Sequence, residues 1–353
     1  MNILISITIM ALAVYFLAII TDEYFIVSLD QISQRFKIPN NVAGASLMAM
    51  GSSAPELFIA LLALIMADGS HSDVGIGTIV GSAIFNILVI TGASAIARPA
   101  NITWRVVVRD IVMYVMSVAL LILVFSNGEI VLWEAALFLV LYAVYIVILF
   151  NWEAFEPNGE GDPIPVVTEE IDVERERTGL FFRITKQVSR IIGFFMGDPE
   201  KSYWRAFAVS IALIAFLSYF LVEYAVVFAE ELHISPVIVA LTLLAAGTSV
   251  PDLFASVIVA KEGRGDMAVA NAVGSNVFDI LIGLGLPWML VLIVQGGVIE
   301  VGTEGLLTST FLLVGTVVLL FVFLATGRKL SRWEGVVLIL VYVAYVLWVW
   351  FAN

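Results

Sequence analysis

The chain has 353 residues, of which 61% are hydrophobic and only 13% charged, and its mean hydropathy is +1.05. Soluble domains are typically about half apolar and a quarter charged, so this composition excludes a soluble globular protein and indicates an integral membrane protein. The net charge of -13 gives no reason to expect a nucleic-acid partner, and the absence of cysteine excludes disulfides and cysteine metal sites.

Apolar runs of about 20 residues recur along the whole chain, and this is the length that a helix needs to cross ~30 Å of hydrocarbon. They lack the alternation of barrel strands, so the predicted class is an all-α membrane protein. We predict ten transmembrane helices, at residues 3–21, 41–66, 74–97, 106–125, 130–150, 205–228, 235–260, 267–294, 305–326 and 333–352.

The first span is followed by two acids, Asp22 and Glu23. Because they come at the end of the apolar run, we expect them to lie at the membrane interface and not to bind ions.

The second span contains the stretch "MAMGSSAPELFIA", in which Gly51, Pro55 and Glu56 interrupt an apolar run. Proline has no N–H to donate, so the carbonyl oxygen of Gly51 is freed in a helix that glycine already weakens. The sequence therefore predicts a broken helix that carries a carboxylate inside the membrane.

The chain is an internal duplication. The segment "GSSAPELF" at 51–58 returns as "GTSVPDLF" at 247–254, and "GSAIFNIL" at 81–88 returns as "GSNVFDIL" at 274–281. Each copy has five spans, and an odd number forces the second copy to enter the membrane upside down. The predicted fold is therefore ten transmembrane helices in two inverted five-helix repeats, with an ion site at the midplane on broken helices.

Three regions follow from this division: a first repeat at 1–150, a loop at 151–200 and a second repeat at 201–353. The loop is rich in acids at first and ends in a predicted amphipathic helix at the membrane surface. Of the 17 Lys and Arg residues, 15 fall in alternate gaps between the spans, and the other two, Arg109 and Arg205, lie in the first turn of the spans that follow those gaps. We therefore predict a multi-pass protein of the cell membrane, with both termini outside and loop 151–200 cytoplasmic.

The repeated motifs place oxygen atoms on four helices, with no sulfur or imidazole among them. Such donors favour hard cations, and flexible carbonyls and hydroxyls suit Ca²⁺ and Na⁺ better than Mg²⁺. Because no Lys or Arg lies nearby within these spans, we expect a bound cation to supply the counter-charge. The candidate ligands are the carboxylates Glu56, Asp252 and Asp279, the amides Asn86 and Asn276, and the hydroxyls Ser52, Ser53, Ser82, Thr248, Ser249 and Ser275.

At these motifs the chain resembles the cation/calcium exchanger superfamily, and within it the potassium-dependent sodium/calcium exchangers. The stretches that carry the resemblance are "DEYF" at 22–25, "VAGASLMAMGSSAPELF", "VGIGTIVGSAIFNIL", "LTLLAAGTSVPDLFASVIVAKEGRGDMAV" and "VGSNVFDILIGLGLPW". The resemblance implies a secondary antiporter in which Na⁺ influx drives Ca²⁺ extrusion by alternating access, with K⁺ co-transported.

The resemblance also implies roles for individual residues. Glu56 and Asp252 would be ligands shared by Ca²⁺ and Na⁺, with the backbone carbonyls of Ala49 and Ala245 beside them. Asp279, with Asn276, matches the position associated with potassium.

Alternatives remain at this stage, namely a proton/calcium antiporter and a cation channel. An intramembrane hydrolase has no nucleophile–base pair in the spans, so we do not expect an enzyme. We predict Ca²⁺, Na⁺ and K⁺ as substrates within a lipid bilayer, with no cofactor and no obligatory protein partner.

Overall fold

The fold is a bundle of long apolar helices, and the structure is a computed structural model. It describes residues 3–37, 47, 49–66, 71–101, 104–155, 187, 192–261, 263–301, 306–326 and 329–352. In these ranges nine helices are long and apolar enough to cross a membrane. The remaining predicted span, at 41–66, contains the shorter apolar helix α5, and most of its first part lies outside the described residues.

The first repeat supplies five helical units, some of which contain a π-helical segment, labelled η. The elements in chain order are α1 (Ile3–Ile20), η1 (Thr21–Phe25), α2 (Ile26–Phe36), α4 (Ala49–Ser52), α5 (Ala54–Ile65), α6 (Ser72–Phe85), η4 (Asn86–Ile90), α7 (Thr91–Ala97), α8 (Trp104–Phe125) and α9 (Leu132–Phe155).

The second repeat follows the same order of units. Its elements are α11 (Tyr203–Leu232), α12 (Pro236–Val239), η6 (Ala240–Leu244), α13 (Ala245–Lys261), α14 (Gly265–Phe278), η7 (Asp279–Leu284), α15 (Gly285–Gln295), α16 (Leu306–Ala325) and α17 (Arg332–Ala352).

The first helix is longer than the sequence predicts. α1, η1 and α2 form one apolar helix of 34 residues, Ile3–Phe36, whereas the predicted span ends at residue 21. The helix continues because apolar residues resume directly after the two acids, and Tyr24, Phe25 and Leu29 are buried there. Asp22 therefore lies near the middle of a helix and not at its end, while its place at the membrane interface stays a prediction.

Two short antiparallel strand pairs join the repeats outside the helices. β1 (Ala100–Asn101) pairs with β4 (Lys329–Leu330), with Ala100 opposite Leu330. β2 (Glu129–Ile130) pairs with β3 (Ile299–Glu300), with Ile130 opposite Ile299. Each pair connects a loop of the first repeat to a loop of the second, which ties the two halves together at the ends of the bundle.

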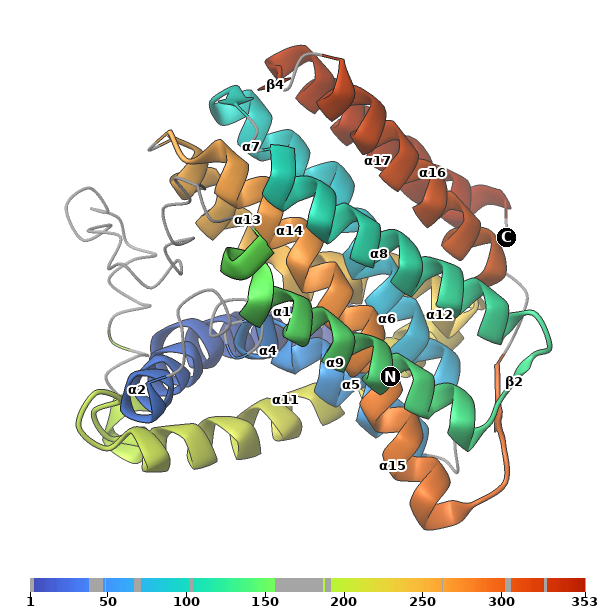
Figure 1. The fold of residues 1–353 in the computed structure, drawn as a ribbon. Helices are drawn as coiled ribbons and strands as arrows, with labels where there is room; N and C mark the ends of the chain where they lie inside the picture. Colours follow the sequence, from blue (N-terminus) through green and yellow to red (C-terminus); the bar gives the residue numbers. More distant parts are fainter. Residues whose placement is uncertain are drawn as a thin grey trace.

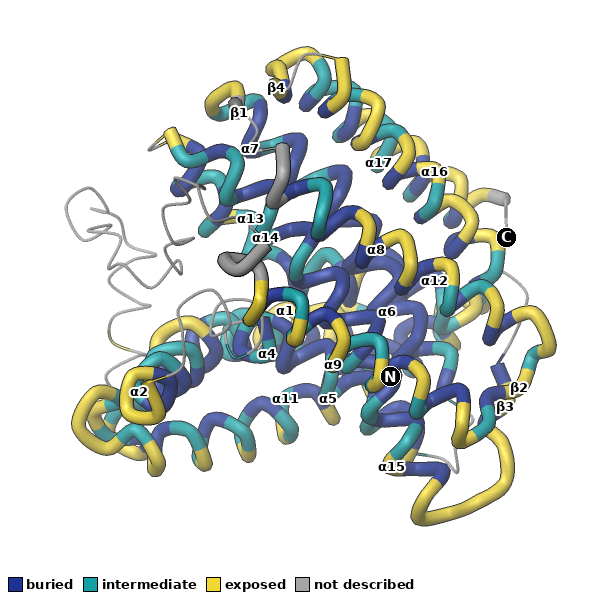
Figure 2. Tube along the Cα trace, in the orientation of Figure 1, coloured by how far each residue is buried: buried dark blue, intermediate teal, exposed yellow. Residues whose placement is uncertain are grey.

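The helices that carry the repeated motifs lie at the centre of the bundle. In Figure 1, α6 and α14 lie inside it, while α11 and α17 lie at opposite sides. Burial follows this arrangement: every residue of α6 except Asp73 is buried, and Figure 2 shows exposed residues along the outer helices. The exposed side chains of α9 and α17 include Trp133, Val140, Trp333 and Leu340, which suits surfaces that contact lipid.

Little of loop 151–200 is described. Residues 156–186 and 188–191 lie outside the described ranges, so the predicted acidic segment and most of the amphipathic helix remain predictions. Residues 192–196, at the end of that helix, are helical, and Phe194 and Phe195 are exposed there.

Candidate functional site

The two copies of the Gly–Pro–acid motif interrupt their helices in different ways. In the first copy Ser53 separates α4 from α5, with φ -93° and ψ 10°, and Pro55 and Glu56 open the new helix. In the second copy α13 continues through Pro251, and the irregularity is the π-helical segment η6 just before it. The predicted break is therefore present in the first copy, whereas the second copy has a π-helical segment.

The second motif of each repeat also marks an irregular segment. η4 begins at Asn86 and η7 begins at Asp279, which are equivalent positions in the duplication. π-helical segments are rare and frequently occur at functional sites, because they change the direction of side chains within a helix. Both candidate ligands thus lie where the helix is locally widened.

The three acids from the two repeats lie near enough to interact electrostatically. The Glu56 carboxyl group contacts the Thr248 side chain and interacts electrostatically with Asp252. Asp279 contacts the Ser53 side chain and interacts with both Glu56 and Asp252. Glu56 is 3% exposed and Asp279 1% exposed, whereas Asp252 is half-buried. We call Glu56, Asp252 and Asp279 the site acids.

Hydrogen bonds also link candidate ligands of the two repeats. The hydroxyls of Ser82 and Ser249 are 2.8 Å apart. Asn86 Nδ2 donates to Asn276 Oδ1 at 2.9 Å, and Asn276 Nδ2 donates to the Ala83 carbonyl at 3.1 Å. These contacts bring candidate ligands of opposite repeats together, as the inverted repeat predicts.

Several of the remaining candidates are hydrogen-bonded to one another. Ser52 Oγ donates to the Ala49 carbonyl at 3.4 Å, and the same carbonyl accepts the Ser53 N–H at 3.0 Å. Thr248 Oγ1 donates to the Ala245 carbonyl at 3.3 Å and to the Leu244 carbonyl at 3.1 Å. A cation that used these oxygens would share or replace local hydrogen bonds. Ser275 is buried next to Asn276 on α14.

The site acids lack the basic partner that another buried acid has. Asp110 accepts hydrogen bonds from Arg109 at 2.7 and 3.0 Å and from the Tyr145 hydroxyl at 3.0 Å. In the described part of the chain no Lys or Arg pairs with a site acid.

Three buried oxygens at the site have no hydrogen-bond partner among the described residues, namely Glu56 Oε2, Asn86 Oδ1 and Asp279 Oδ1. An unpaired buried charge is costly, so this arrangement fits oxygens that a cation binds.

Carboxylates alone do not enclose an ion. Within the described ranges, no three Asp, Glu or His side chains lie close enough to one another to hold a metal ion by themselves. A cation between the repeats would therefore need hydroxyl, amide or carbonyl oxygens as well, and Ca²⁺ commonly takes such mixed oxygen sets.

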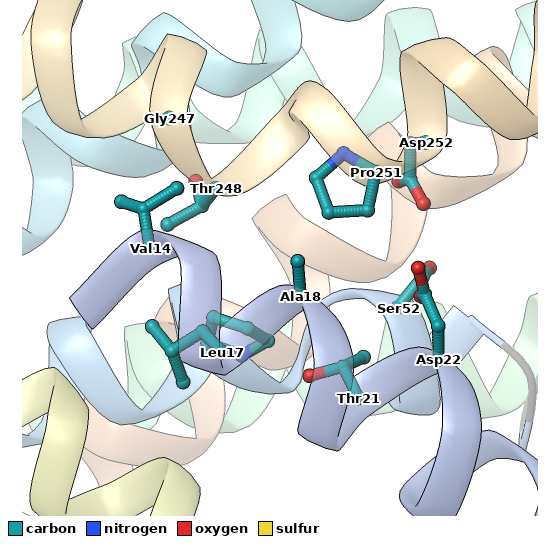
Figure 3. A pocket seen from close by; sticks show the side chains of 11 residues that line it. Val14, Leu17, Ala18, Thr21, Asp22, Ser52, Gly247, Thr248, Pro251 and Asp252 are labelled. Carbon is teal, nitrogen blue, oxygen red and sulfur yellow. The ribbon is translucent and has the colours of Figure 1, made fainter. Parts of the chain in front are cut away.

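A small pocket reaches the site from one side, and we call it the α1–α13 pocket. Its lining includes Thr21 and Asp22 of η1, Ser52 of α4, and Thr248 and Asp252 of α13 (Figure 3). Thus Asp252 and Thr248 line the pocket, while the Glu56 and Asp279 side chains do not. Of these residues, sequence reasoning did not expect Asp22, because the apolar run ends at that point.

Tyr114 of α8 is a second residue that the sequence did not identify. Its side chain is 0% exposed, its hydroxyl has no hydrogen-bond partner of good geometry, and it lies beside Asn276 and Asp279. The sequence gives no sign that this tyrosine lies beside the site, because tyrosines in apolar spans also occur at lipid interfaces and in helix packing.

Comparisons with known proteins agree with this architecture. The family described as sodium/calcium exchanger protein matches residues 6–151 and 202–351. Sodium/potassium/calcium exchanger 4 of Homo sapiens is 29% identical, over 91% of this chain and 76% of the relative. Sodium/potassium/calcium exchanger 5 of Homo sapiens is 31% identical, over 92% and 79%.

Two solved structures share the fold. The sodium-calcium exchanger NCX_Mj, soaked with Na⁺ and Sr²⁺, aligns with a TM-score of 0.58 and 23% identity, over 98% of this chain and 99% of that one. The H⁺/Ca²⁺ exchanger CAX aligns with a TM-score of 0.69 and 14% identity, over 98% and 82%. At these identities the likeness concerns the fold alone.

Proposed function

Because the chain belongs to the sodium/calcium exchanger protein family, which consists of secondary transporters and not of enzymes, we propose that it exchanges Na⁺ for Ca²⁺ with K⁺ co-transported. The observation that carries this proposal is that the three site acids interact with one another and pair with no Lys or Arg of the described ranges. The names of the sodium/potassium/calcium exchangers among its relatives support the choice of ions.

The ions compete for one set of oxygens. Three ionised carboxylates are balanced by one Ca²⁺ and one K⁺, or by three Na⁺, so either load gives the same net charge. An uncompensated charge in a low-dielectric interior is costly. In this proposal, therefore, only the ion-loaded protein changes easily between the conformations that open to the two sides of the membrane. The carboxylates, amides and hydroxyls named above are the ligands in this proposal, with the Ala49 and Ala245 carbonyls.

The inverted repeat supports alternating access as part of this proposal. The α1–α13 pocket leads to Asp252 and Thr248, whereas Glu56, the counterpart of Asp252 in the first repeat, is buried. Inverted repeats allow the two halves to exchange conformations, which would open the opposite route to the same site. The distribution of Lys and Arg supports an orientation with both termini outside and loop 151–200 in the cytoplasm.

Proteoliposomes with the purified protein test the exchange. We expect an outward Na⁺ gradient to drive ⁴⁵Ca²⁺ uptake, and replacement of Na⁺ by an impermeant cation at constant pH to stop it. Uptake that continues and follows the proton gradient would indicate a proton/calcium antiporter. Large conductance without coupled counterflow would indicate a channel.

The K⁺ assignment makes a separate prediction for Asp279. We expect K⁺ to stimulate Na⁺-driven ⁴⁵Ca²⁺ uptake by the wild type and Asp279→Asn to remove this stimulation, because the amide no longer contributes a charge at the site. The measurement compares the initial rates with and without K⁺ for both proteins. If the initial rate of the wild type were the same with and without K⁺, K⁺ co-transport would be refuted, whereas the proposal of Na⁺/Ca²⁺ exchange would stand.

A further inference from the structure

Asp22 places a further carboxylate opposite a site acid. Figure 3 shows the Asp22 side chain, on the first helix, pointing across the α1–α13 pocket toward Asp252 and Ser52. Asp22 and Asp252 interact electrostatically. Thr21, Ser52 and Thr248 also belong to the lining, so residues with hydroxyl groups flank the two carboxylates.

Among the residues that the structure describes, none contributes a positive charge to the pocket. Its lining contains two acids and no Lys, Arg or His. Within the described residues no basic side chain pairs with Asp22, which is an exposed residue. Two ionised carboxylates that face one another in a membrane protein repel, and a cation between them removes this cost.

The duplication indicates that the fold does not require an acid at this position. "TDEYF" at 21–25 corresponds to "LVEYA" at 221–225, so the Glu–Tyr pair is shared and Asp22 is replaced by Val222. Val222 is 0% exposed and lies in α11, which is an uninterrupted helix, whereas Asp22 lies in the π-helical segment η1. Only the first copy therefore combines an acid with a local helix irregularity, and such irregularities are frequent at functional sites.

A path of oxygen atoms connects this pocket to the buried part of the site. Thr248 lines the pocket, and its side chain contacts the Glu56 carboxyl group. Glu56 is 3% exposed, and its Oε2 has no hydrogen-bond partner. Because this buried oxygen has no hydrogen-bond partner among the described residues, it supports a cation ligand beyond the acid pair.

We propose that Asp22 is a cation ligand at the accessible end of the site, where it binds Ca²⁺ or Na⁺ together with Asp252. This assignment rests on the proposed exchange function and adds to it an access subsite that the second repeat lacks. The cation first exchanges part of its water for the two carboxylates and then moves past Thr248 to Glu56. Since Val222 replaces the acid in the other copy, the two sides of the membrane differ in this step.

The substitution Asp22→Asn tests the assignment, with Glu23→Gln as the matched control. Glu23 is the next residue on η1 and is exposed, but it does not line the pocket. We expect Asp22→Asn to raise the half-saturating Ca²⁺ concentration on one side of the membrane by about tenfold, as loss of a supporting ligand typically does. Glu23→Gln should stay within about twofold of the wild type, and Asp22→Glu should keep most of the wild-type affinity, because it retains the charge.

Two measurements distinguish a failure of the Asp22 assignment from a failure of the proposed exchange function. ⁴⁵Ca²⁺ uptake into proteoliposomes gives the half-saturating concentration on each side, and equilibrium ⁴⁵Ca²⁺ binding to the purified proteins needs no transport. If the wild type binds Ca²⁺ but does not exchange it for Na⁺, the proposed function fails, and the binding comparison still decides the role of Asp22. Equal Ca²⁺ affinity of Asp22→Asn, Glu23→Gln and the wild type would overturn the assignment. The assignment would also be overturned if Asp22→Glu lost as much Ca²⁺ affinity as Asp22→Asn.

Discussion

Glu56→Gln is expected to reduce Na⁺-driven ⁴⁵Ca²⁺ uptake by roughly 100-fold or more, which corresponds to about 2.7 kcal/mol or more. The substitution keeps the size of a side chain that is almost fully buried, and it removes one of the three charges of the site. It also replaces one acceptor oxygen by an NH₂ group, which repels a cation. The initial rate of uptake at saturating Na⁺, relative to the wild type, measures the effect.

Although Glu56→Gln impairs transport, we do not expect it to lower the stability of the ion-free protein. Glu56 Oε2 has no hydrogen-bond partner, and no basic residue of the described chain pairs with the carboxylate. Because the unpaired charge is removed, we expect the ion-free variant to unfold at the same or a higher temperature than the wild type. Addition of Ca²⁺ should raise the unfolding temperature of the wild type only. Normal Ca²⁺ transport by a folded Glu56→Gln variant would contradict the assignment of this residue.

Gly81→Ala is expected to separate two helices that meet beside the site. A Cβ atom at Gly81 would overlap the Leu241 carbonyl oxygen and would lie 2.7 Å from the Ala245 Cβ. One contacted atom belongs to the backbone and the other to a short side chain, and neither can rotate away. The helices α6 and η6–α13 must therefore move apart. Overpacking of this kind typically costs ~1 to 3 kcal/mol, and the neighbouring Ser82–Ser249 contact would lengthen with it. We expect a lower unfolding temperature and a Ca²⁺ affinity reduced by roughly tenfold.

Gly315→Ala is the matched control for this prediction. Gly315 is an exposed residue within α16, and no described atom lies within 4 Å of a Cβ placed there. Alanine favours a helix over glycine, so this variant should be as stable as the wild type or slightly more stable. Equal unfolding temperatures and Ca²⁺ affinities of Gly81→Ala and Gly315→Ala would contradict the prediction that the close helix approach at Gly81 is needed for stability and Ca²⁺ binding.

The helical class and the repeat relation could be predicted because they depend on local patterns. Apolar runs long enough to span a membrane specify where the helices lie, and the repeated motifs at Glu56 and Asp252 specify which of them correspond. An odd number of spans in each copy then forces the inverted arrangement. The contact of Asn86 with Asn276 agrees with this reasoning, since the two residues come from opposite repeats.

The features that were missed depend on tertiary packing. The first helix continues to Phe36 because Tyr24 and Phe25 are buried after the two acids, which hydropathy alone does not reveal. Pro251 predicts a break, but α13 continues through it, with the irregularity at η6 instead. Tyr114 reaches the site only because α8 packs beside α14. A single apolar sequence carries no pattern for such contacts between helices.

The buried acids of this protein differ in whether the described chain compensates their charge. Asp110 has the Arg109 guanidinium and the Tyr145 hydroxyl as partners, so the protein itself compensates its charge. Glu56 and Asp279 have hydroxyl contacts but also an oxygen without any partner. Since the same chain compensates one buried acid and leaves others open, the open ones fit a cation that comes and goes.

Equilibrium binding of ⁴⁵Ca²⁺ to the purified protein tests most directly whether the two repeats form one shared ion site. The comparison uses the wild type, Glu56→Gln and Asp252→Asn, each with and without competing Na⁺. We predict that the wild type binds Ca²⁺ that Na⁺ displaces, and that either single substitution removes this binding. Retention of Na⁺-sensitive Ca²⁺ binding with wild-type affinity by either variant would contradict a site shared between the repeats.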